Sequence, residues 1–536
     1  MNGAEAVAVA FAAAGMPAIF GVPGGGSSLD LIAAAKARGI PFHLARTESG
    51  AGIMALTLAE LSHRPVGVLV TRGPGVSNAA NGIADASLER APVVLVADGF
   101  GKAEARFATH QLFDQAAMMA PVTRAQQRSQ DVPAGAAAVE ALSAALSEPR
   151  GPAYVELSGE DARAEVPAPP AWTPPRLNPP DHALVAEAGR LLSGARRPVL
   201  IAGLEATAPG RAEAVRALAE ALCCPALVTY KAKGVVPDAH PLFGGVFTGG
   251  EAEAPILREA DLILLLGADP IEFIPQPWRF DAPILDFANA ERSLEYRAPT
   301  LQVTGAWEAA VEALAGKAGR SGWTEGCIAC HRETWLAALE NGPGGNLGIS
   351  PSAIVRLAQA ACREVGADPR VAVDAGAHMF PSTTFWQAER PGDLLISNGL
   401  ASMGHALPAA IAAAIHDPAR GAIALTGDGG LLMALGELAT AAAMGLRLVV
   451  VVFNDATLSL IDIKKGGRDL PSRSLDWPEA DFAQVMRGFG GEAWRASSEA
   501  EFSDAMREAL ASGRPALVDA RCDPSSYGRQ IKALRG

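Results

Sequence analysis

The chain has 536 residues, more than one hydrophobic core usually organises, so a single small module is excluded and three or four domains are expected. Hydrophobic residues make up 49% and charged residues 19%, which excludes a disordered protein. The 45 Lys and Arg against 58 Asp and Glu leave a net charge of -13 without a long basic run, which argues against a nucleic-acid partner and for small-molecule ligands.

The sequence gives no sign of export or membrane insertion. Met1 to Gly21 is apolar but holds no Lys or Arg, so it lacks the basic start of a signal peptide. The longest strongly hydrophobic run, Leu448 to Phe453, is far below the ~20 residues that span a bilayer. Six cysteines are too few for a disulfide framework. We therefore expect a soluble, cytoplasmic protein with no membrane partner.

The first third of the chain alternates short Val, Ile and Leu runs with Ala-rich stretches. Strands are predicted at Ala18–Val22, Val66–Val70 and Val93–Asp98, and helices at Leu29–Ala37 and Ser77–Glu89. Because parallel strands need helical crossovers that cover both faces, this order predicts a doubly wound parallel sheet in a domain at 1–165.

A proline-rich segment ends this domain. Residues 166–180 contain seven prolines, which cannot continue a helix or a central strand, so we predict a linker over 166–182. A second α/β domain is predicted at 183–335, with strands at Val199–Ala202, Leu262–Leu266 and Ile284–Phe287 and a helix at Ala306–Ala318. The glycine-rich segment 342–348 marks the next boundary.

The last third, at 345–536, follows the same pattern. It opens with a predicted helix at Pro351–Glu364. Its predicted strands are Val371–Asp374, Leu394–Ser397, Ala422–Thr426, Leu448–Phe453 and Ala516–Ala520. Three α/β domains of roughly 150 to 190 residues thus account for the chain.

The most informative motif is Gly427-Asp428-Gly429-Gly430, between a predicted strand and a helix expected to begin near Leu431. Such strand ends host ligands in open α/β sheets. Glycines let the backbone approach an anion closely, and a carboxylate can hold a divalent cation, so diphosphate with Mg²⁺ is the expected guest.

A second acidic residue follows at the end of the next strand. Asp455 lies 27 residues after Asp428, behind the hydrophobic run Leu448–Phe453. Two such strand ends can be neighbours in a doubly wound sheet, so both carboxylates can grip one ion. The Thr457 carbonyl, two diphosphate oxygens and a water would complete an octahedral shell.

These motifs resemble those of the thiamine diphosphate (ThDP) enzymes of the decarboxylase and acetolactate synthase group, whose metal motif is Gly-Asp-Gly followed about two dozen residues later by Asn-Asn. Here Asp455 stands for the second Asn, which keeps an oxygen ligand and adds a negative charge. The resemblance covers nearly the full chain. It implies ThDP and Mg²⁺ as cofactors, and three doubly wound domains called PYR (pyrimidine-binding), central and PP (diphosphate-binding).

The resemblance also assigns a catalytic residue. Arg46-Thr47-Glu48-Ser49-Gly50 looks like the family's catalytic glutamate segment, so Glu48 would hydrogen-bond the aminopyrimidine ring and promote loss of the thiazolium C2 proton. In that family the glutamate and the diphosphate site come from different subunits. The resemblance therefore implies a homodimer or homotetramer with active sites at the subunit interface.

Further cofactor contacts follow from the same resemblance. Met403 would be the wedge between the two rings of the cofactor, and the Ala401 carbonyl would accept from its amino group. His378 lies on a loop expected near the diphosphate. The remaining cofactor contacts are glycines of the two loops: Gly24, Gly427, Gly429 and Gly430.

The expected substrate pocket differs more from the family's pattern than the cofactor contacts do. Benzoylformate decarboxylases have a pocket serine where this chain has Gly25, and a pocket histidine where it has Thr71. Arg72 would hold a substrate carboxylate or form a surface ion pair, and both readings stay open. The other candidates are His110 and Gln111 and an apolar wall of Leu458, Leu460 and Ile461; His405 lies near an active-site segment without an assigned role.

Two differences from acetolactate synthases concern their flavin and their substrate. The flavin-binding Arg of their Gly-Ala-Arg motif is replaced in Gly267-Ala268-Asp269-Pro270, so we predict no tightly bound FAD. Their selectivity tryptophan corresponds to Lys464. The sequence Cys327-Ile328-Ala329-Cys330-His331 matches a haem attachment pattern, but it lies in a predicted helix, and we expect neither haem nor zinc there.

The sequence thus predicts a ThDP- and Mg²⁺-dependent decarboxylase of a 2-oxo acid, a carboligase that adds the resulting enamine to an aldehyde or second keto acid, or both. Two alternatives stay open: a lyase acting on 2-hydroxyacyl-CoA thioesters, and a catalytically silent ThDP-binding regulator.

Overall fold

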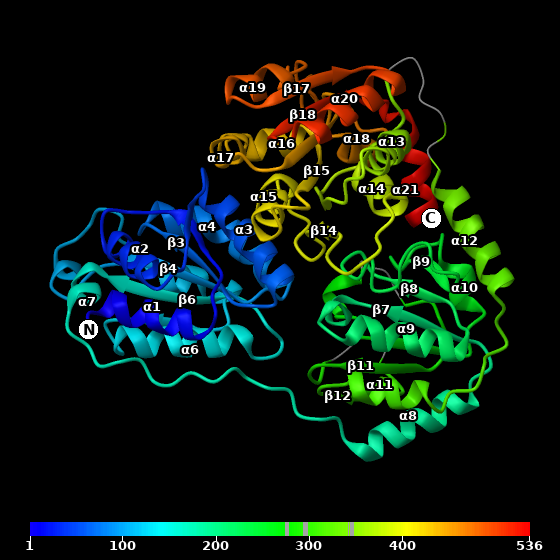
Figure 1. Cartoon of the computed structure of the whole chain (residues 1–536), viewed down its shortest axis with the longest axis horizontal. Helices are drawn as coiled ribbons and strands as arrows, with labels where there is room; N and C mark the ends of the chain where they lie inside the picture. Colours follow the sequence, from blue (N-terminus) through cyan, green and yellow to red (C-terminus); the bar gives the residue numbers. More distant parts are fainter. Residues whose placement is uncertain (274–277, 293–297, 341, 343–347, 536) are drawn as a thin grey trace. The chain divides into compact units, whose positions relative to one another are not determined.

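The computed structural model describes residues 1–273, 278–292, 298–340, 342 and 348–535 (Figure 1). The predicted boundary at residue 345 lies outside the described residues. By their contacts the residues form two compact units, and the predicted domain limits stay predictions. Unit 1 holds Met1–Arg176, Gly399–Ala422 and Leu432–Leu448, and unit 2 holds Leu177–Asn398, Ile423–Leu431 and Val449–Gly536.

The first sheet has six strands in the order β2-β1-β3-β4-β6-β5, and every pairing with a defined register is parallel. Its strands are β1 (Ile19–Val22), β2 (Phe42–Leu44), β3 (Val66–Val70), β4 (Val93–Gly99), β5 (Gln126–Arg128) and β6 (Ala153–Ser158). Its helices are α1 (Gly3–Ala13), α2 (Ser27–Ala37), α3 (Glu48–Ser62), α4 (Pro74–Leu88), α5 (Gln115–Met119), α6 (Ala134–Leu146) and α7 (Gly159–Arg163).

Ala-rich helices cover both faces of this sheet. Helices α1, α2 and α6 share one aliphatic core with the strands, in which Phe11, Leu31 and Leu142 are fully buried. Helices α3 and α4 pack against each other, away from α1 and α6 (Figure 1). Residues 166–181 form neither helix nor strand, as the prolines require.

The central sheet has a different strand order. It runs β12-β11-β10-β7-β8-β9, which read from β9 is 3-2-1-4-5-6 in chain order, the order of dinucleotide-binding folds. Its strands are β7 (Pro198–Ala202), β8 (Ala226–Val228), β9 (Phe243–Val246), β10 (Leu262–Leu266), β11 (Ile284–Ala288) and β12 (Leu301–Thr304). Its helices are α8 (His182–Gly194), α9 (Arg211–Leu222), α10 (Ala254–Arg258), α11 (Glu308–Ala315) and α12 (Glu325–Leu339).

The third sheet repeats the strand order of the first, β14-β13-β15-β16-β18-β17. Its strands are β13 (Arg370–Val373), β14 (Leu394–Ile396), β15 (Ala422–Gly427), β16 (Leu448–Asn454), β17 (Glu492–Ala496) and β18 (Ala516–Arg521). Its helices are α13 (Pro351–Glu364), α14 (Met379–Phe385), α15 (Ala406–His416), α16 (Asp428–Ala434), α17 (Glu437–Met444), α18 (Ser459–Lys465), α19 (Phe482–Gly488), α20 (Glu499–Ser512) and α21 (Tyr527–Arg535).

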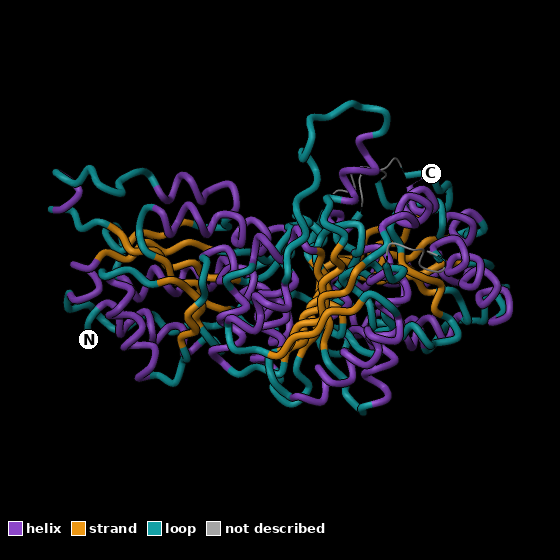
Figure 2. Tube along the Cα trace, turned by 90° about the horizontal axis from the view of Figure 1, so that it is seen from above, coloured by secondary structure: helices purple, strands orange, loops and turns teal. Residues whose placement is uncertain are grey.

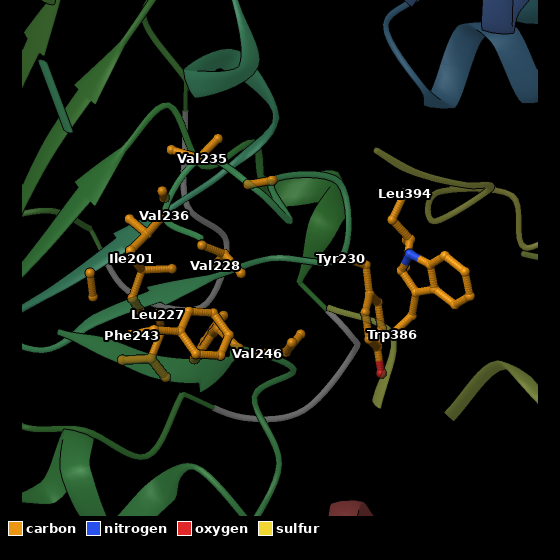
Figure 3. Close-up of a cluster of buried hydrophobic side chains, with 14 of the residues drawn as sticks. Ile201, Leu227, Val228, Tyr230, Val235, Val236, Phe243, Val246, Trp386 and Leu394 are labelled. Carbon is orange, nitrogen blue, oxygen red and sulfur yellow. The ribbon is translucent and has the colours of Figure 1, made fainter. Parts of the chain in front are cut away.

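Inside unit 2 one continuous hydrophobic core joins residues of the central sheet to residues of the third sheet. Figure 3 shows its central part, with Ile201, Leu227 and Phe243 in one cluster and Tyr230 beside Trp386. In Figure 2 the orange strands of the sheets lie among purple helices. No helix of the described part has both the length and the hydropathy that a membrane span requires.

The predicted fold class of three doubly wound parallel sheets is confirmed. One local prediction is wrong: the helix after β15 begins at Asp428 rather than near Leu431. An Asp in the first turn suits the positive end of a helix, and the Asp428 Oδ1 accepts from the Gly429 N–H at 2.7 Å.

Candidate active site

The strand order explains where the predicted site residues lie. In the orders β2-β1-β3 and β14-β13-β15 the direction of winding reverses between two neighbouring strands, and ligands of α/β proteins bind outside the carboxyl ends of such a pair. Gly24 and Thr71 follow β1 and β3, while His378 and Asp428 follow β13 and β15. The structure thus places the predicted residues at two switch points.

Unit 1 contains a pocket of about 490 Å³ at the start of α3. Thr47, Ser49 and Gly50 line it from the turn that carries Glu48, and Met403 lines it from the segment before α15. The remaining lining residues are Ile53, Asn81, Leu400, Ser402, Gly404, Pro408, Met433 and Ala434. The pocket therefore brings the neighbours of the predicted catalytic glutamate together with the predicted wedge of the cofactor.

Glu48 is the first residue of α3 and is 9% exposed. Its carboxylate accepts from the Asn78 amide of α4 at 3.4 Å. The Thr47 hydroxyl caps the helix by accepting from the Gly50 N–H at 3.0 Å. The capped start of α3 thus gives Glu48 a defined backbone position at the edge of the pocket.

A second glutamate, which the sequence did not single out, holds this turn. One Glu437 carboxylate oxygen accepts from the backbone N–H groups of Arg46 and Thr47, both at 3.0 Å. The Thr440 hydroxyl donates to its other oxygen at 2.7 Å, and Glu437 is 1% exposed. Because charged acceptors make the stronger hydrogen bonds, Glu437 is a positioning residue for the segment that carries Glu48.

The segment before α15 is attached to α4 at three points. Glu89 accepts from the Gly399 N–H at 2.7 Å, the Asn81 amide donates to the Ser402 hydroxyl at 3.0 Å, and the His405 ring lies 3.0 Å from Asp85. His405 and Asp85 are both buried, so His405 has a structural partner. Between these contacts Ala401 is exposed at a φ of 55° and Met403 is half-buried.

The glycine loop after β1 packs tightly at Gly24. A Cβ there would lie 2.3 Å from an Asp98 carboxylate oxygen and 2.4 Å from the Thr71 hydroxyl, so a side chain does not fit. At Gly25 a Cβ would meet nothing within 4 Å. Asp98, which the sequence did not reveal, anchors α2 by accepting from the Ser28 N–H at 2.8 Å.

The other substrate candidates from this loop region have separate contacts in the structure. Arg72 forms an ion pair with Glu104 at 2.8 Å, and its guanidinium lies 4.0 Å above the Phe100 ring, which is the ion-pair reading. His110 is exposed. Gln111 has a φ of 60° and packs on Gly73, where a Cβ would lie 2.8 Å from the Gln111 Cβ.

In unit 2, the two predicted metal carboxylates meet at the ends of β15 and β16. Asp428 is 3% exposed, and one of its oxygens accepts from the Ala456 N–H at 2.5 Å. Burial, and then the charge of Asp455, raise the pKa of Asp428 to about 7. Burial raises the pKa of Asp455 to about 6, although the Ser459 hydroxyl donates to it at 2.5 Å.

Two close buried carboxylates fit a divalent cation, because its charge would offset both their burial and their repulsion. The Thr457 N–H donates to Asp455 at 3.2 Å, and the Thr457 carbonyl accepts from the Ser459 N–H at 2.9 Å, with a second lone pair left for a ligand. Within the described ranges no group of three or more His, Cys, Asp or Glu side chains is arranged for a metal. Mg²⁺ would therefore need additional oxygens, as a diphosphate supplies.

The region around Gly427 and Gly430 also fits a diphosphate. The His378 ring packs on Phe453, and a Cβ at Gly427 would lie 3.1 Å from that ring. Burial lowers the pKa of His378 to about 3, and its buried Nε2 has no hydrogen-bond partner among the described atoms. A neutral imidazole N–H beside a glycine is a suitable phosphate donor.

Gly430 must stay small for another reason. A Cβ there would lie 2.4 Å from a carboxylate oxygen of Asp374, which also accepts from the Thr426 hydroxyl at 2.7 Å. Gly429 is buried within the same turn. Asp374 is 1% exposed and holds the turn through these contacts. Its position directly after β13 in the sequence did not predict this role.

The predicted apolar wall stays a prediction. Leu460 packs against the hydrophobic core, while Ile461 is 45% exposed and Leu458 is half-buried.

The switch point of the central sheet, between β7 and β10, is closed by its own residues. A Cβ at Gly203 would lie 2.2 Å from the Ala268 Cα and 2.5 Å from a Glu272 carboxylate oxygen. That oxygen accepts from the N–H groups of Leu204 at 2.8 Å and Asp269 at 2.9 Å, and the Thr229 hydroxyl donates to the other oxygen at 2.5 Å.

The Glu272 carboxylate thus takes the backbone donors that a pyrophosphate would need at this crevice. Glu272 is 3% exposed, and burial raises its pKa to about 8. The residues present at the switch point therefore do not fit the pyrophosphate of FAD. Of the cysteine motif, Cys327 and Cys330 lie on α12, and the His331 ring lies 3.1 Å from Glu259.

Comparison with known protein families shows which family the chain belongs to. Models of the thiamine pyrophosphate enzymes match the N-terminal TPP binding domain at residues 1–118, the central domain at 185–314 and the C-terminal TPP binding domain at 374–520. The chain belongs to this family. Thiamine pyrophosphate is ThDP, so the predicted resemblance is confirmed, and the chain is a ThDP-dependent enzyme of the acetolactate synthase-like group.

Individual relatives span almost the whole length. The chain is 29% identical to acetolactate synthase of Bacillus subtilis (strain 168), covering 98% of this chain and 94% of that one. It is 26% identical to the catabolic acetolactate synthase of Raoultella terrigena, with 98% and 97% covered. It is 27% identical to acetolactate synthase isozyme 1 large subunit of Escherichia coli (strain K12), with 97% and 94% covered.

Proposed function

We propose that this enzyme uses ThDP and Mg²⁺ to decarboxylate a 2-oxo acid and to join the resulting unit to an aldehyde or second keto acid. The observation that carries the proposal is the pair of buried carboxylates, Asp428 and Asp455, which meet at the ends of β15 and β16 beside the glycine turn. The full-length similarity to acetolactate synthases, whose name describes the joining of two such units, supports the carboligation half.

Each residue has a defined task in this proposal. Bound ThDP supplies the electron sink that carbanion chemistry needs. Glu48, held at the start of α3, exchanges a proton with the aminopyrimidine ring. Met403 fixes the bend between the rings and the Ala401 carbonyl accepts from the amino group. Glu437 and Asn78 keep Glu48 in place.

The diphosphate end is assigned to unit 2. Asp428, Asp455 and the Thr457 carbonyl hold Mg²⁺, and the Nε2 of His378 donates to a phosphate oxygen. Gly427, Gly429 and Gly430 leave room for the backbone to approach the phosphates. Gly24 is the cofactor contact assigned to the loop after β1 in unit 1. These contacts use groups that are buried and charged, or buried and without a partner in the described residues.

We further propose that the enzyme works without FAD, because Glu272 fills the central crevice. We also propose a homodimer or homotetramer. Apolar side chains on unit 1, among them Phe107 at 77% and Met433 at 62% exposed, need cover from water, and Met433 lines the pocket itself.

The test uses purified enzyme with ThDP and Mg²⁺ and a panel of 2-oxo acids, with and without aldehydes, while CO₂ and the organic products are measured. We expect CO₂ release and a hydroxyketone product. The Glu48→Gln variant should lose both, whereas Glu140→Gln, which changes an exposed glutamate of α6, should keep both. No CO₂ from any 2-oxo acid, or full activity in Glu48→Gln, would refute the proposal.

The same panel separates the alternatives. A product released from a 2-hydroxyacyl-CoA ester would identify the lyase. Binding of ThDP without turnover of any substrate would identify the silent regulator.

A further inference from the structure

Unit 2 contains a second pocket, of about 460 Å³, and none of the residues assigned to ThDP lines it. It lies where α12, α13 and the end of α14 meet the loop before β9. Its lining residues are Asp238, Ala239, Phe243, Arg332, Trp335, Leu336, Arg356, Gln359, Arg363, Thr384, Phe385 and Gln387. It therefore sits at the junction between the central sheet and the third sheet, a common place for ligand sites.

Most of the charged side chains that line this pocket are positive. Arg332, Arg356 and Arg363 line it together with a single carboxylate, Asp238. The Asp238 charge is matched by Lys233, which is fully buried and lies 2.6 Å away. Three guanidinium groups thus face one pocket in a chain whose net charge is -13. Such a local positive field within an acidic protein attracts anions.

The guanidinium groups keep donors to spare. Arg332 donates to the His240 carbonyl at 3.0 Å, Arg363 to the Gln387 side chain at 2.5 Å, and Arg356 pairs with Glu340 at 2.5 Å. Each guanidinium carries five N–H groups in a planar fork. Arg356 and Arg363 are also exposed, so the remaining donors of the pair can reach a ligand.

The floor of the pocket is aromatic. Trp335, Phe243 and Phe385 line it and are 3%, 2% and 6% exposed. The Arg356 guanidinium lies 4.2 Å above the Phe385 ring. The buried indole N–H of Trp335 has no hydrogen-bond partner among the described residues. The pocket therefore combines guanidinium groups with an aromatic floor.

We propose that this pocket binds a nucleotide-like ligand, whose phosphate groups contact Arg332 and Arg363 and whose planar ring packs on the aromatic floor. Arginine forks match phosphate oxygens in pairs, and aromatic and guanidinium faces stack on flat rings. A plain anion would leave the aromatic floor unused, and an apolar ligand would leave the free donors of the guanidinium groups without an acceptor. The site is separate from the proposed ThDP chemistry and does not depend on the substrate of the enzyme.

The probe is ADP, titrated calorimetrically into enzyme saturated with ThDP and Mg²⁺, so that the coenzyme's own diphosphate site is filled. We expect one saturable site per chain and weaker binding of adenosine and of pyrophosphate alone. Arg332→Gln and Arg363→Gln should each weaken ADP binding at least about tenfold. Arg190→Ala, which removes a guanidinium exposed on α8 outside the pocket, should leave it unchanged.

Thermal unfolding of each variant establishes that it is folded, and the exposed Arg363 provides a variant that folding does not depend on. The proposal is overturned if ADP does not bind at about 1 mM. It is equally overturned if both arginine variants bind ADP like the parent enzyme, or if excess ThDP abolishes the binding. If pyrophosphate bound as tightly as ADP, the aromatic floor would contribute nothing to binding. The proposal of a nucleotide-like ligand would then be overturned in favour of a simple anion site.

Discussion

Glu272 offers a sharp test of the closed central crevice, because its carboxylate is buried and held by two backbone N–H groups and one hydroxyl. Burial raises its pKa from 4.5 to about 8. The folded chain therefore keeps the Glu272 carboxyl group protonated at neutral pH, whereas the same group is ionised in the unfolded chain. Because its pKa is raised in the folded state, Glu272 makes its full contribution to the unfolding free energy below pH 4.5. This contribution is lost as the pH rises toward 8.

The Glu272→Gln variant has nearly the same shape and cannot ionise. Between those two pKa values, each pH unit lowers the unfolding free energy of the parent enzyme by about 1.4 kcal/mol. Relative to the variant, the unfolding free energy of the parent enzyme should therefore fall by about 2 kcal/mol between pH 6 and pH 7.5. If the central domain unfolds as a unit of about 150 residues, this corresponds to roughly 4–8 °C in Tm.

The assay is calorimetric unfolding of both proteins at pH 6 and pH 7.5, with Glu213→Gln as control, since Glu213 lies exposed on α9 of the same domain. The control should follow the parent enzyme at both pH values. Parallel behaviour of Glu272→Gln and the parent enzyme would show that the carboxylate is not held in a dry site. The crevice would then be open to solvent, and the structural reason for excluding FAD would fail.

Three further predictions concern the proposed active site. Glu48→Gln should lower kcat by about 10²–10⁴-fold without changing Tm or ThDP affinity, measured by steady-state kinetics and cofactor titration. Glu437→Gln should lower kcat about tenfold while the pH profile keeps its shape, because Glu437 acts through the position of α3, and a shifted profile would contradict that role. Gly430→Ala should cost about 1–3 kcal/mol in unfolding free energy through contact with Asp374, whereas Gly25→Ala, with open space around it, should cost nothing measurable.

The elements of this chain were predictable where one local pattern dominates. Val66–Val70, Leu262–Leu266 and Pro351–Glu364 have the predicted bounds, because apolar runs and proline at a helix start are local signals. Strand β5, Gln126–Arg128, contains no apolar residue and was missed, since pairing with β6 rather than composition makes it a strand.

The site residues, too, were predictable only where nearby positions in the chain carry the signal. Asp428 and Asp455 were expected to meet because 27 residues of helix and strand separate them in the chain, and β15 and β16 are neighbours in the sheet. Glu437 contacts Arg46 and Thr47 across about 390 positions of sequence, and nothing near it in the chain announces that partner. Glu272 likewise acts only through strand order, which brings the loop after β10 against the loop after β7.

Strand order also accounts for the different fates of the three switch points. The first and third sheets share one order, and at both switch points glycines and polar side chains stand at the strand ends, with the buried His378 Nε2 still lacking a partner in the described residues. The central sheet has the order of dinucleotide-binding folds, yet Glu272 satisfies the donors of its own crevice. A reversal of strand order therefore offers a crevice, but side chains decide its contents. Glu272 takes the backbone donors of the central crevice, whereas the residues predicted for ThDP lie at the switch points of the first and third sheets.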